Sequence, residues 1–136
     1  MRDQLISFLD RVNEAENFQL FDVDVCLYVD KLQKYASIIS IIKDSKLKGL
    51  VAYYANDQEK GLAFLSMLAV DPKSTSMGYG KMLLTASIKE IEKKGFKKYG
   101  LEVRKNNLKA IELYNSFGFI NIEDRKENFI YMEKTL

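Results

Sequence analysis

The sequence predicts a single domain with a mixed α/β layer fold. Apolar residues recur at helical spacing at the start of the chain and again in its second half. Short runs rich in β-branched and aromatic residues lie between these helical segments. With 136 residues, 47% of them hydrophobic, the chain is long enough to bury one core without disulfides or metal. We therefore expect residues 1–136 to form one domain in which helices and strands pack in layers.

The first half of the chain predicts two helices followed by three strands. Leu5, Leu9 and Val12 repeat at helical spacing, and Asp22 or Asp24 is a suitable cap for the second helix. Turn residues, Asp44-Ser45 among them, separate the strands and predict an antiparallel meander. The expected elements are an opening helix, a helix from about Asp24 to Tyr35, and strands at Ser37–Ile42, Leu50–Ala55 and Leu62–Val70.

The second half predicts two helices that alternate with strands. Gly95 and Gly118 are typical helix stops, and Asn107 is a good N-cap for the shorter helix. Tyr99 to Arg104 alternate between apolar and other residues, as in a half-buried strand. The expected elements are a helix at Gly80–Lys94, a strand at Tyr99–Arg104, a short helix from Asn107 to Gly118, and strands at Phe119–Arg125 and Phe129–Lys134.

The composition excludes several catalytic chemistries. The chain has no His, so it has neither a Ser-His-Asp nor a Cys-His relay. Its one cysteine, Cys26, cannot form an intrachain disulfide or build a zinc site of the usual ligands. A single thiol fits a reducing compartment, and we expect Cys26 to be a small buried apolar residue.

Charge and hydropathy indicate neither a nucleic-acid partner nor a membrane partner. The net charge is +2, and no apolar run approaches the roughly 20 residues of a membrane span, so a cytoplasmic protein is expected. Locally, residues 1–30 carry about −5 and residues 71–110 about +6. These regions are either solvated helix faces, or they favour a cationic ligand near the first and an anionic ligand near the second.

The segment from Val70 to Leu84 contains a glycine turn that leads into a helix. Gly78 and Gly80 stand at the helix start, where unpaired N–H groups and the helix dipole suit a pyrophosphate. An ordinary glycine turn is the alternative. A Walker A loop is excluded by Thr75 and Met82, and a dinucleotide-binding fingerprint by Leu83.

A second motif follows one helix later. Asn107, Ala110 and Tyr114 are followed by Gly118-Phe119, which gives Asn-x-x-Ala-x-x-x-Tyr with a closing Gly-Phe. Together with Val-x-Pro and the Gly-x-Gly loop, this resembles the GNAT superfamily of N-acetyltransferases over about residues 37–136. The chain departs from the family pattern at Thr75, where Gln or Arg is usual, and the sequence predicts no strand before the first helix.

The resemblance implies a fold, a cofactor and binding residues. The fold is a central mixed, mostly antiparallel sheet flanked by helices, and the co-substrate is acetyl-CoA, with no metal. Lys73, Lys105 and Lys109 are candidates for the outer phosphates. The implied binding residues are Leu68, Ala69 and Val70 for the pantetheine arm, Ser76, Met77, Gly78, Tyr79, Gly80 and Lys81 for the pyrophosphate, and Asn107 for the cofactor arm.

The resemblance also implies catalytic roles for Tyr114 and Glu102. A phenol with a pKa of about 10 stays protonated at pH 7, so Tyr114 is expected to protonate the leaving thiolate. Glu102 is the candidate base, directly or through water. The alternatives are a core tyrosine at position 114, a solvated glutamate at position 102 and a plain helix cap at Asn107.

The expected reaction is direct attack of an amine on acetyl-CoA, because no activated nucleophile for a covalent relay is visible. The short, acidic N-terminal region favours a small primary amine such as an amino sugar, an amino acid or a polyamine. Acetylation of a protein N-terminus or lysine is the alternative function, and a non-catalytic CoA sensor is a further one. A homodimer is left open.

Overall fold

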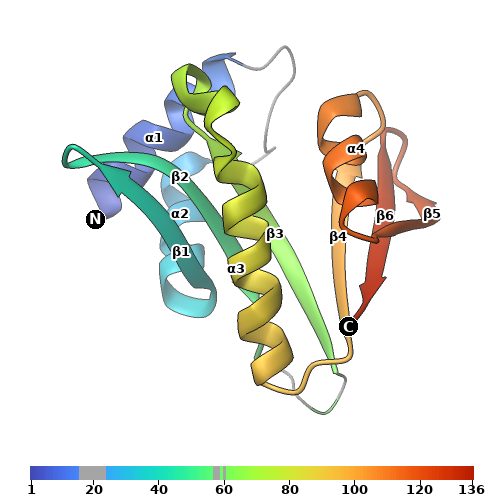
Figure 1. The fold of residues 1–136 in the computed structure, drawn as a ribbon. Coiled ribbons are helices and arrows are strands. Elements are labelled where there is room, and N and C mark those ends of the chain that lie inside the picture. Colours follow the sequence, from blue (N-terminus) through green and yellow to red (C-terminus); the bar gives the residue numbers. More distant parts are fainter. Residues whose placement is uncertain (16–23, 57–58, 60) are drawn as a thin grey trace. The chain divides into compact units, whose positions relative to one another are not determined.

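The computed structural model describes residues 1–15, 24–56, 59 and 61–136 (Figure 1). Among these residues, six strands form one sheet in the order β1-β2-β3-β4-β6-β5, and four α-helices accompany them. This confirms the mixed fold with a mostly antiparallel sheet. The helices are α1 (Arg2–Ala15), α2 (Val25–Tyr35), α3 (Tyr79–Lys93) and α4 (Leu108–Ser116), with a 3₁₀ helix, η1 (Pro72–Met77); the strands are β1 (Ser37–Lys43), β2 (Lys46–Tyr54), β3 (Leu62–Val70), β4 (Lys98–Arg104), β5 (Ile120–Arg125) and β6 (Phe129–Thr135).

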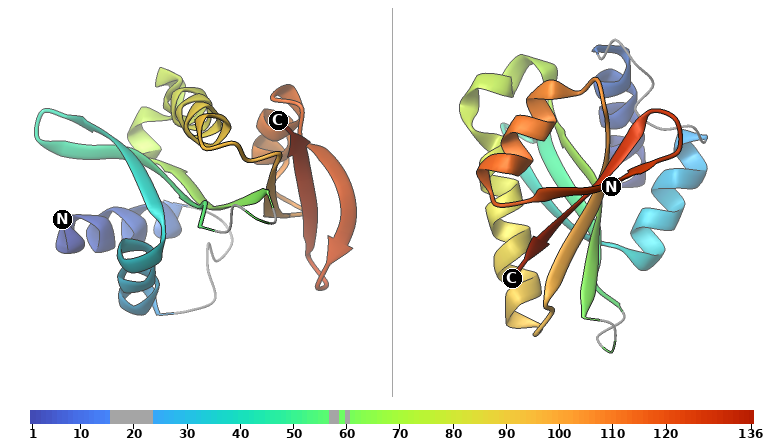
Figure 2. Two further views of the ribbon diagram at one scale, coloured as in Figure 1. Left: turned by 90° about the horizontal axis from the view of Figure 1, so that it is seen from below. Right: turned by 90° about the vertical axis from the view of Figure 1, so that its right-hand side faces the viewer.

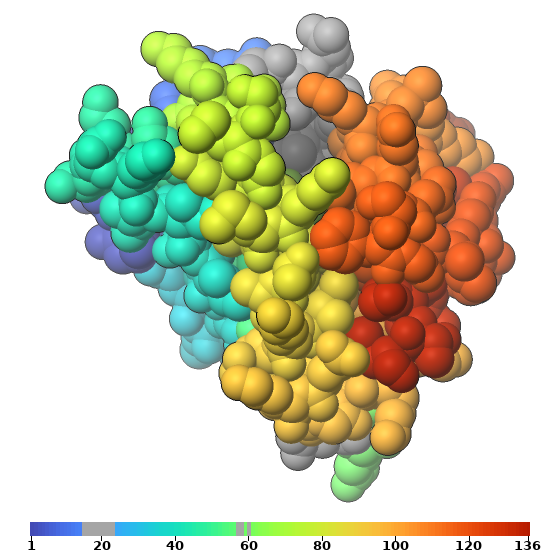
Figure 3. All heavy atoms as spheres, in the orientation of Figure 1, coloured from blue at the N-terminus to red at the C-terminus, as the bar shows by residue number. Residues whose placement is uncertain are grey.

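The chain packs as two compact units, each described by itself. The first unit comprises Met1–Tyr53 and Met67–Ser87, and the second comprises Tyr54–Ser66 and Ile88–Leu136. Strand β3 and helix α3 each contribute residues to both units. Helix α3 buries Leu83, Leu84 and Ile91 and exposes its other side, which faces the viewer in Figure 3.

In the first unit, α1 packs against α2, and η1 contacts α1. The buried face of α1 carries Leu5, Leu9 and Val12, as the helical spacing predicts. Asp24 caps α2 by accepting hydrogen bonds from the N–H groups of Cys26 and Leu27. The prediction of a buried Cys26 is wrong, because its side chain is exposed. Helix α2 instead buries Val29 and Leu32.

The β1–β2 hairpin turns at Asp44 and Ser45, as predicted, and both residues have positive φ angles of 54° and 63°. Such a two-residue turn keeps the strands paired up to its edge. For this reason β2 begins at Lys46, paired with Lys43, and not at the predicted Leu50.

In the second unit, β4 pairs in parallel with the first residues of β3 and antiparallel with β6, and β5 pairs with β6. One face of β4 carries Tyr99, Leu101 and Val103, all buried. The ring of Phe119, directly after α4, lies 5.7 Å from the rings of Tyr99 and Tyr114. These contacts place the end of α4 against this face (Figure 2).

No helix among the described residues is long and apolar enough to cross a membrane.

Candidate active site

The predicted pyrophosphate loop, Ser76–Lys81, lies in the first unit, and the segment that leads into it begins at Asp71. The Asp71 carboxylate accepts a hydrogen bond of 3.0 Å from the N–H of Lys73 and caps η1. At Gly78 the chain adopts left-handed geometry (φ 77°, ψ 14°), and no atom lies within 4 Å of the place where a Cβ would stand. This turn ends η1 and directs the chain into α3, so the glycine is required by the backbone itself.

The N-terminus of α3 carries the features that the sequence predicted. Its first intrahelical bond runs from the N–H of Met82 to the carbonyl of Gly78 (3.1 Å), so the N–H groups of Tyr79, Gly80 and Lys81 precede it. The first turn has no acidic side chain that would occupy the positive end of the helix dipole. These backbone groups can donate hydrogen bonds to an anion.

Asp71 holds the start of this loop against α1 and β2. Its N–H donates to the carbonyl of Lys48 (2.8 Å), and Arg11 donates to its carboxylate (3.2 Å). Asp71 is 8% exposed, and its pKa is lowered, first by the N–H of Lys73 and also by Arg11. The segment that leads into the loop therefore begins at a fixed, ionised carboxylate.

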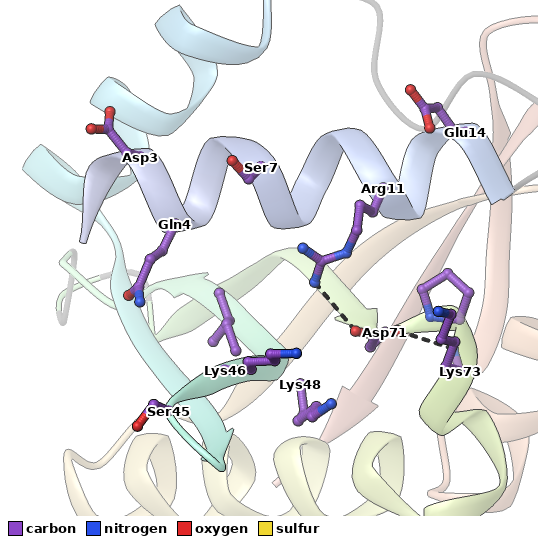
Figure 4. Close-up of a pocket in the computed structure, with 12 residues that line it drawn as sticks. Asp3, Gln4, Ser7, Arg11, Glu14, Ser45, Lys46, Lys48, Asp71 and Lys73 are labelled. Atoms are coloured by element: carbon purple, nitrogen blue, oxygen red, sulfur yellow. Dashed lines mark hydrogen bonds and ion pairs between the residues drawn. The ribbon is translucent and has the colours of Figure 1, made fainter.

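A cleft of about 840 Å³ opens beside this carboxylate, within the first unit (Figure 4). Its lining comes from α1, the β1–β2 turn, the start of β2 and Asp71–Lys73. Lys73, a candidate for the outer phosphates, lines this cleft. The Ser76–Lys81 segment does not line it. The cationic lining residues are Arg11, Lys46, Lys48 and Lys73, and the acidic ones are Asp3, Glu14 and Asp71.

The predicted pantetheine-binding residues also lie in the first unit, at the end of β3. Ala69 is buried, whereas Leu68 and Val70 are half-buried. This alternation is that of a strand with its two faces in different surroundings.

Asn107 lies in the second unit and caps α4. Its side-chain oxygen accepts a hydrogen bond of 3.3 Å from the N–H of Ala110. The capping interpretation is therefore correct. The cap uses the amide oxygen and leaves the side-chain N–H₂ group as a donor. The cap therefore does not conflict with the contact to the cofactor arm that the resemblance implies, and that contact stays a prediction.

Tyr114 lies in the last turns of α4 and is 7% exposed. Its ring contacts that of Phe119 in a T-shaped arrangement. Burial raises the pKa of Tyr114 above its usual value, so the phenol stays protonated at neutral pH. No described residue forms a hydrogen bond with its hydroxyl, which can therefore donate to another group.

Glu102 lies on the face of β4 opposite to Leu101 and Val103, and it is half-buried. One carboxylate oxygen, Oε2, accepts a hydrogen bond of 3.3 Å from Arg125. Arg125 also donates to Glu123 (3.1 Å), and its guanidinium lies 4.1 Å from the centre of the Tyr131 ring. Glu102 is thus held by a hydrogen bond from the protein, and its role as a base stays a prediction.

The candidate residues fall into two groups. The loop Ser76–Lys81 and the Leu68–Val70 segment belong to the first unit, whereas Glu102, Asn107 and Tyr114 belong to the second. No pattern in the sequence pointed to Arg125 or Tyr131 as neighbours of Glu102. A Glu-x-Arg pattern at 123–125 was visible, but simple strand alternation gave no reason to connect it with Glu102.

The chain was compared with known proteins. The Acetyltransferase (GNAT) family matches residues 5–119. The ribosomal protein bS18-alanine N-acetyltransferase of Haemophilus ducreyi is 33% identical over 114 residues, which cover 73% of this chain and 79% of that protein. The spermine/spermidine N(1)-acetyltransferase of Bacillus subtilis is 28% identical over 124 residues, covering 86% and 82%.

A solved structure has the same fold. PaiA N-acetyltransferase from Thermoplasma acidophilum, in complex with coenzyme A, has a TM-score of 0.80 at 20% identity, over 99% of this chain and 92% of that one. The family match spans the loop at Gly78 and Gly80 as well as Asn107 and Tyr114. The chain belongs to the GNAT family of acetyltransferases.

Proposed function

We propose that this acetyltransferase moves the acetyl group of acetyl-CoA directly to a primary amine, with Tyr114 as proton donor and Glu102 as proton acceptor. The observation that carries the proposal is the state of Tyr114. Its hydroxyl is kept protonated by burial and takes no hydrogen bond from the described residues. The ring packs against Phe119, and the hydroxyl is left as the polar end of this side chain.

The features of the loop support acetyl-CoA as the donor. A pyrophosphate needs several N–H groups, room for close approach and no competing carboxylate. The start of α3 offers the N–H groups of Tyr79, Gly80 and Lys81, open space at Gly78 and a first turn free of acidic residues. The Thermoplasma structure with its bound coenzyme A supports the same ligand class.

When bound, acetyl-CoA supplies a thioester, in which the acetyl group is bonded to a good leaving group, the CoA thiolate. Glu102 accepts a proton from the acceptor ammonium, directly or through water, so that the neutral amine attacks. Tyr114 donates its proton to the thiolate that leaves, and the second proton that the nitrogen loses on becoming an amide restores the phenol through solvent. Both residues act by moving protons, and no residue of the chain becomes acetylated.

The acceptor is proposed to be a small primary amine, in agreement with the polyamine acetyltransferase among the relatives. The negative charge of residues 1–30 is weaker support for a cationic acceptor than the sequence alone suggested. Asp24 caps α2 and Asp30 bonds Arg2 at 2.7 Å, so two of the seven acidic residues in this region serve the fold. A protein N-terminus is the second candidate, because the bS18-alanine enzyme is 33% identical.

The experiment is a panel of amines with detection of the released thiol. Glucosamine, alaninamide, spermidine and an alanine-initiated tetrapeptide represent the candidate classes. We expect thiol release only when acetyl-CoA and an amine are both present, and a faster reaction at higher pH as the ammonium loses its proton. Release without any amine would contradict direct transfer. Turnover of the tetrapeptide alone would select a protein acceptor.

A further inference from the structure

A β-bulge in β5 places Arg125 on the same face of the sheet as Glu102. If side chains alternated without interruption from Ile120 onward, Glu123 and Arg125 would lie on the face of the sheet opposite to that of Ile120. The register shifts between Asn121 and Glu123, so that Ile120, Glu123 and Arg125 pair with Glu133, Tyr131 and Phe129 of β6. On the other side of β6, Tyr131 pairs with Glu102. Bulges commonly re-aim side chains beside active sites.

Arg125 bridges the two carboxylates on this face. Its Nη1 donates to Oε2 of Glu102 (3.3 Å), and its Nε donates to Oε1 of Glu123 (3.1 Å). The guanidinium lies over the Tyr131 ring at 4.1 Å. A planar cation held by two hydrogen bonds and a ring has one favoured position.

The Tyr131 ring is itself fixed. It is 5% exposed, and its hydroxyl donates to Glu133 (2.8 Å). It lies over Gly100, where a Cβ would come within 2.9 Å of two ring carbons. A glycine in the middle of β4 thus makes room for the ring on which Arg125 rests.

We propose that Arg125 is a positioning residue that holds the Glu102 carboxylate in the orientation needed to accept the proton of the acceptor amine. The proposal rests on the function assigned to Glu102 above. Arg125 occupies Oε2, while Oε1 takes no hydrogen bond from the described residues. The two carboxylates and one guanidinium carry a net charge of −1, so the cluster still attracts an ammonium.

A purely structural role makes a different prediction. If Arg125 only tied β5 to β4 and β6, its loss would lower the melting temperature and would leave kcat/KM of the folded enzyme unchanged, with or without the Glu102 carboxylate. A positioning role acts through that carboxylate, and the effect disappears once the carboxylate has gone. A double-mutant cycle separates the two.

The experiment compares wild type, Arg125→Gln, Glu102→Gln and the double variant, with Arg125→Lys and Lys126→Gln beside them. The assay is thiol release with the fastest amine among alaninamide, spermidine and the alanine-initiated tetrapeptide, together with thermal melting of each variant. Lys126→Gln is the matched control, since it removes a neighbouring cation that lies over Phe129.

We expect Arg125→Gln to lower kcat and acceptor kcat/KM about tenfold, with the KM for acetyl-CoA unchanged. In the Glu102→Gln background the same change should alter kcat/KM less than about twofold. Arg125→Lys should recover only part of the loss, because an ammonium cannot hold both carboxylates and the ring. Lys126→Gln should match wild type.

Equal losses in both backgrounds, or wild-type kinetics in Arg125→Gln, would overturn the positioning role. A wild-type protein that turns over no amine would refute the proposed function itself. An active wild type with an equally active Glu102→Gln would remove Glu102 from the mechanism. These outcomes separate a failure of the Arg125 proposal from a failure of the function on which it depends.

Discussion

Replacement of Gly100 by Ala is a sharp test of how side chains pack in the second unit. A Cβ at this position would overlap the Tyr131 hydroxyl and stand 2.9 Å from ring carbons Cε1 and Cζ. Ordinary van der Waals contact needs at least 3.4 Å. Gly100→Ala therefore forces the ring to move, and a ring that is 5% exposed cannot move without disturbing its neighbours. Overpacking of this kind costs about 2 kcal/mol.

Urea denaturation of Gly100→Ala should show this loss in the free energy of unfolding, with a fall in Tm of roughly 6–10 °C. The matched background is Tyr131→Leu, which removes the ring and leaves space for the new methyl group. In that background Gly100→Ala should cost less than about 0.5 kcal/mol. A cost that is small in the wild-type background, or equal in both, would refute the packing of Tyr131 on Gly100.

Three further predictions follow from the sites described above. Asn107→Ala should lower the free energy of unfolding by about 1 kcal/mol in urea denaturation, because α4 loses its cap, and Asn107→Ser should restore most of it. Asp71 has a lowered pKa in the fold, so its stabilisation is present above its unfolded-state pKa of about 4 and is lost as the pH falls through the lower folded-state value. Between pH 7 and pH 3, wild type should therefore lose more stability than Asp71→Asn, and equal losses would contradict the Arg11 and Lys73 contacts. We expect acetyl-CoA to raise the Tm of wild type in a thermal-shift assay, and Gly80→Asp should fold but show no such rise, because a carboxylate then occupies the helix start proposed to bind the pyrophosphate.

The order of the elements could be predicted from sequence because local signals agree with the fold. The spacing of Leu5, Leu9 and Val12 gives the buried face of α1, and Asp24 and Asn107 are caps as expected. Gly95 and Gly118 have positive φ angles at the helix ends that they mark. In each case a residue type is dictated by its own backbone or by neighbours within a few positions.

The features that could not be predicted depend on contacts between residues far apart in the sequence. Cys26 was predicted to be a small buried apolar residue. Whether it is buried depends on which face of α2 packs against the protein, and that face carries Val29 and Leu32. The link between Glu102 and Arg125 depends on a bulge that reverses the alternation in β5. Neither the packing partner of a helix nor the register of an edge strand can be predicted from local composition.

The candidate site could be predicted only as separate motifs. The loop at Gly78 and Gly80 and the cap at Asn107 have the local geometry that their sequences indicate. The roles assigned to them stay predictions, since geometry within each unit does not establish ligand binding.

Replacement of Tyr114 by Phe tests the central claim most directly, because it removes one hydroxyl and keeps the ring that packs against Phe119. The measurement is kcat with the best amine, together with the Kd for acetyl-CoA by titration calorimetry. The proposed mechanism predicts a fall in kcat of at least about tenfold with Kd unchanged within twofold, because the proton donor acts only as the thiolate leaves. An unchanged kcat would show that Tyr114 only packs against Phe119, and would contradict its assignment as the proton donor.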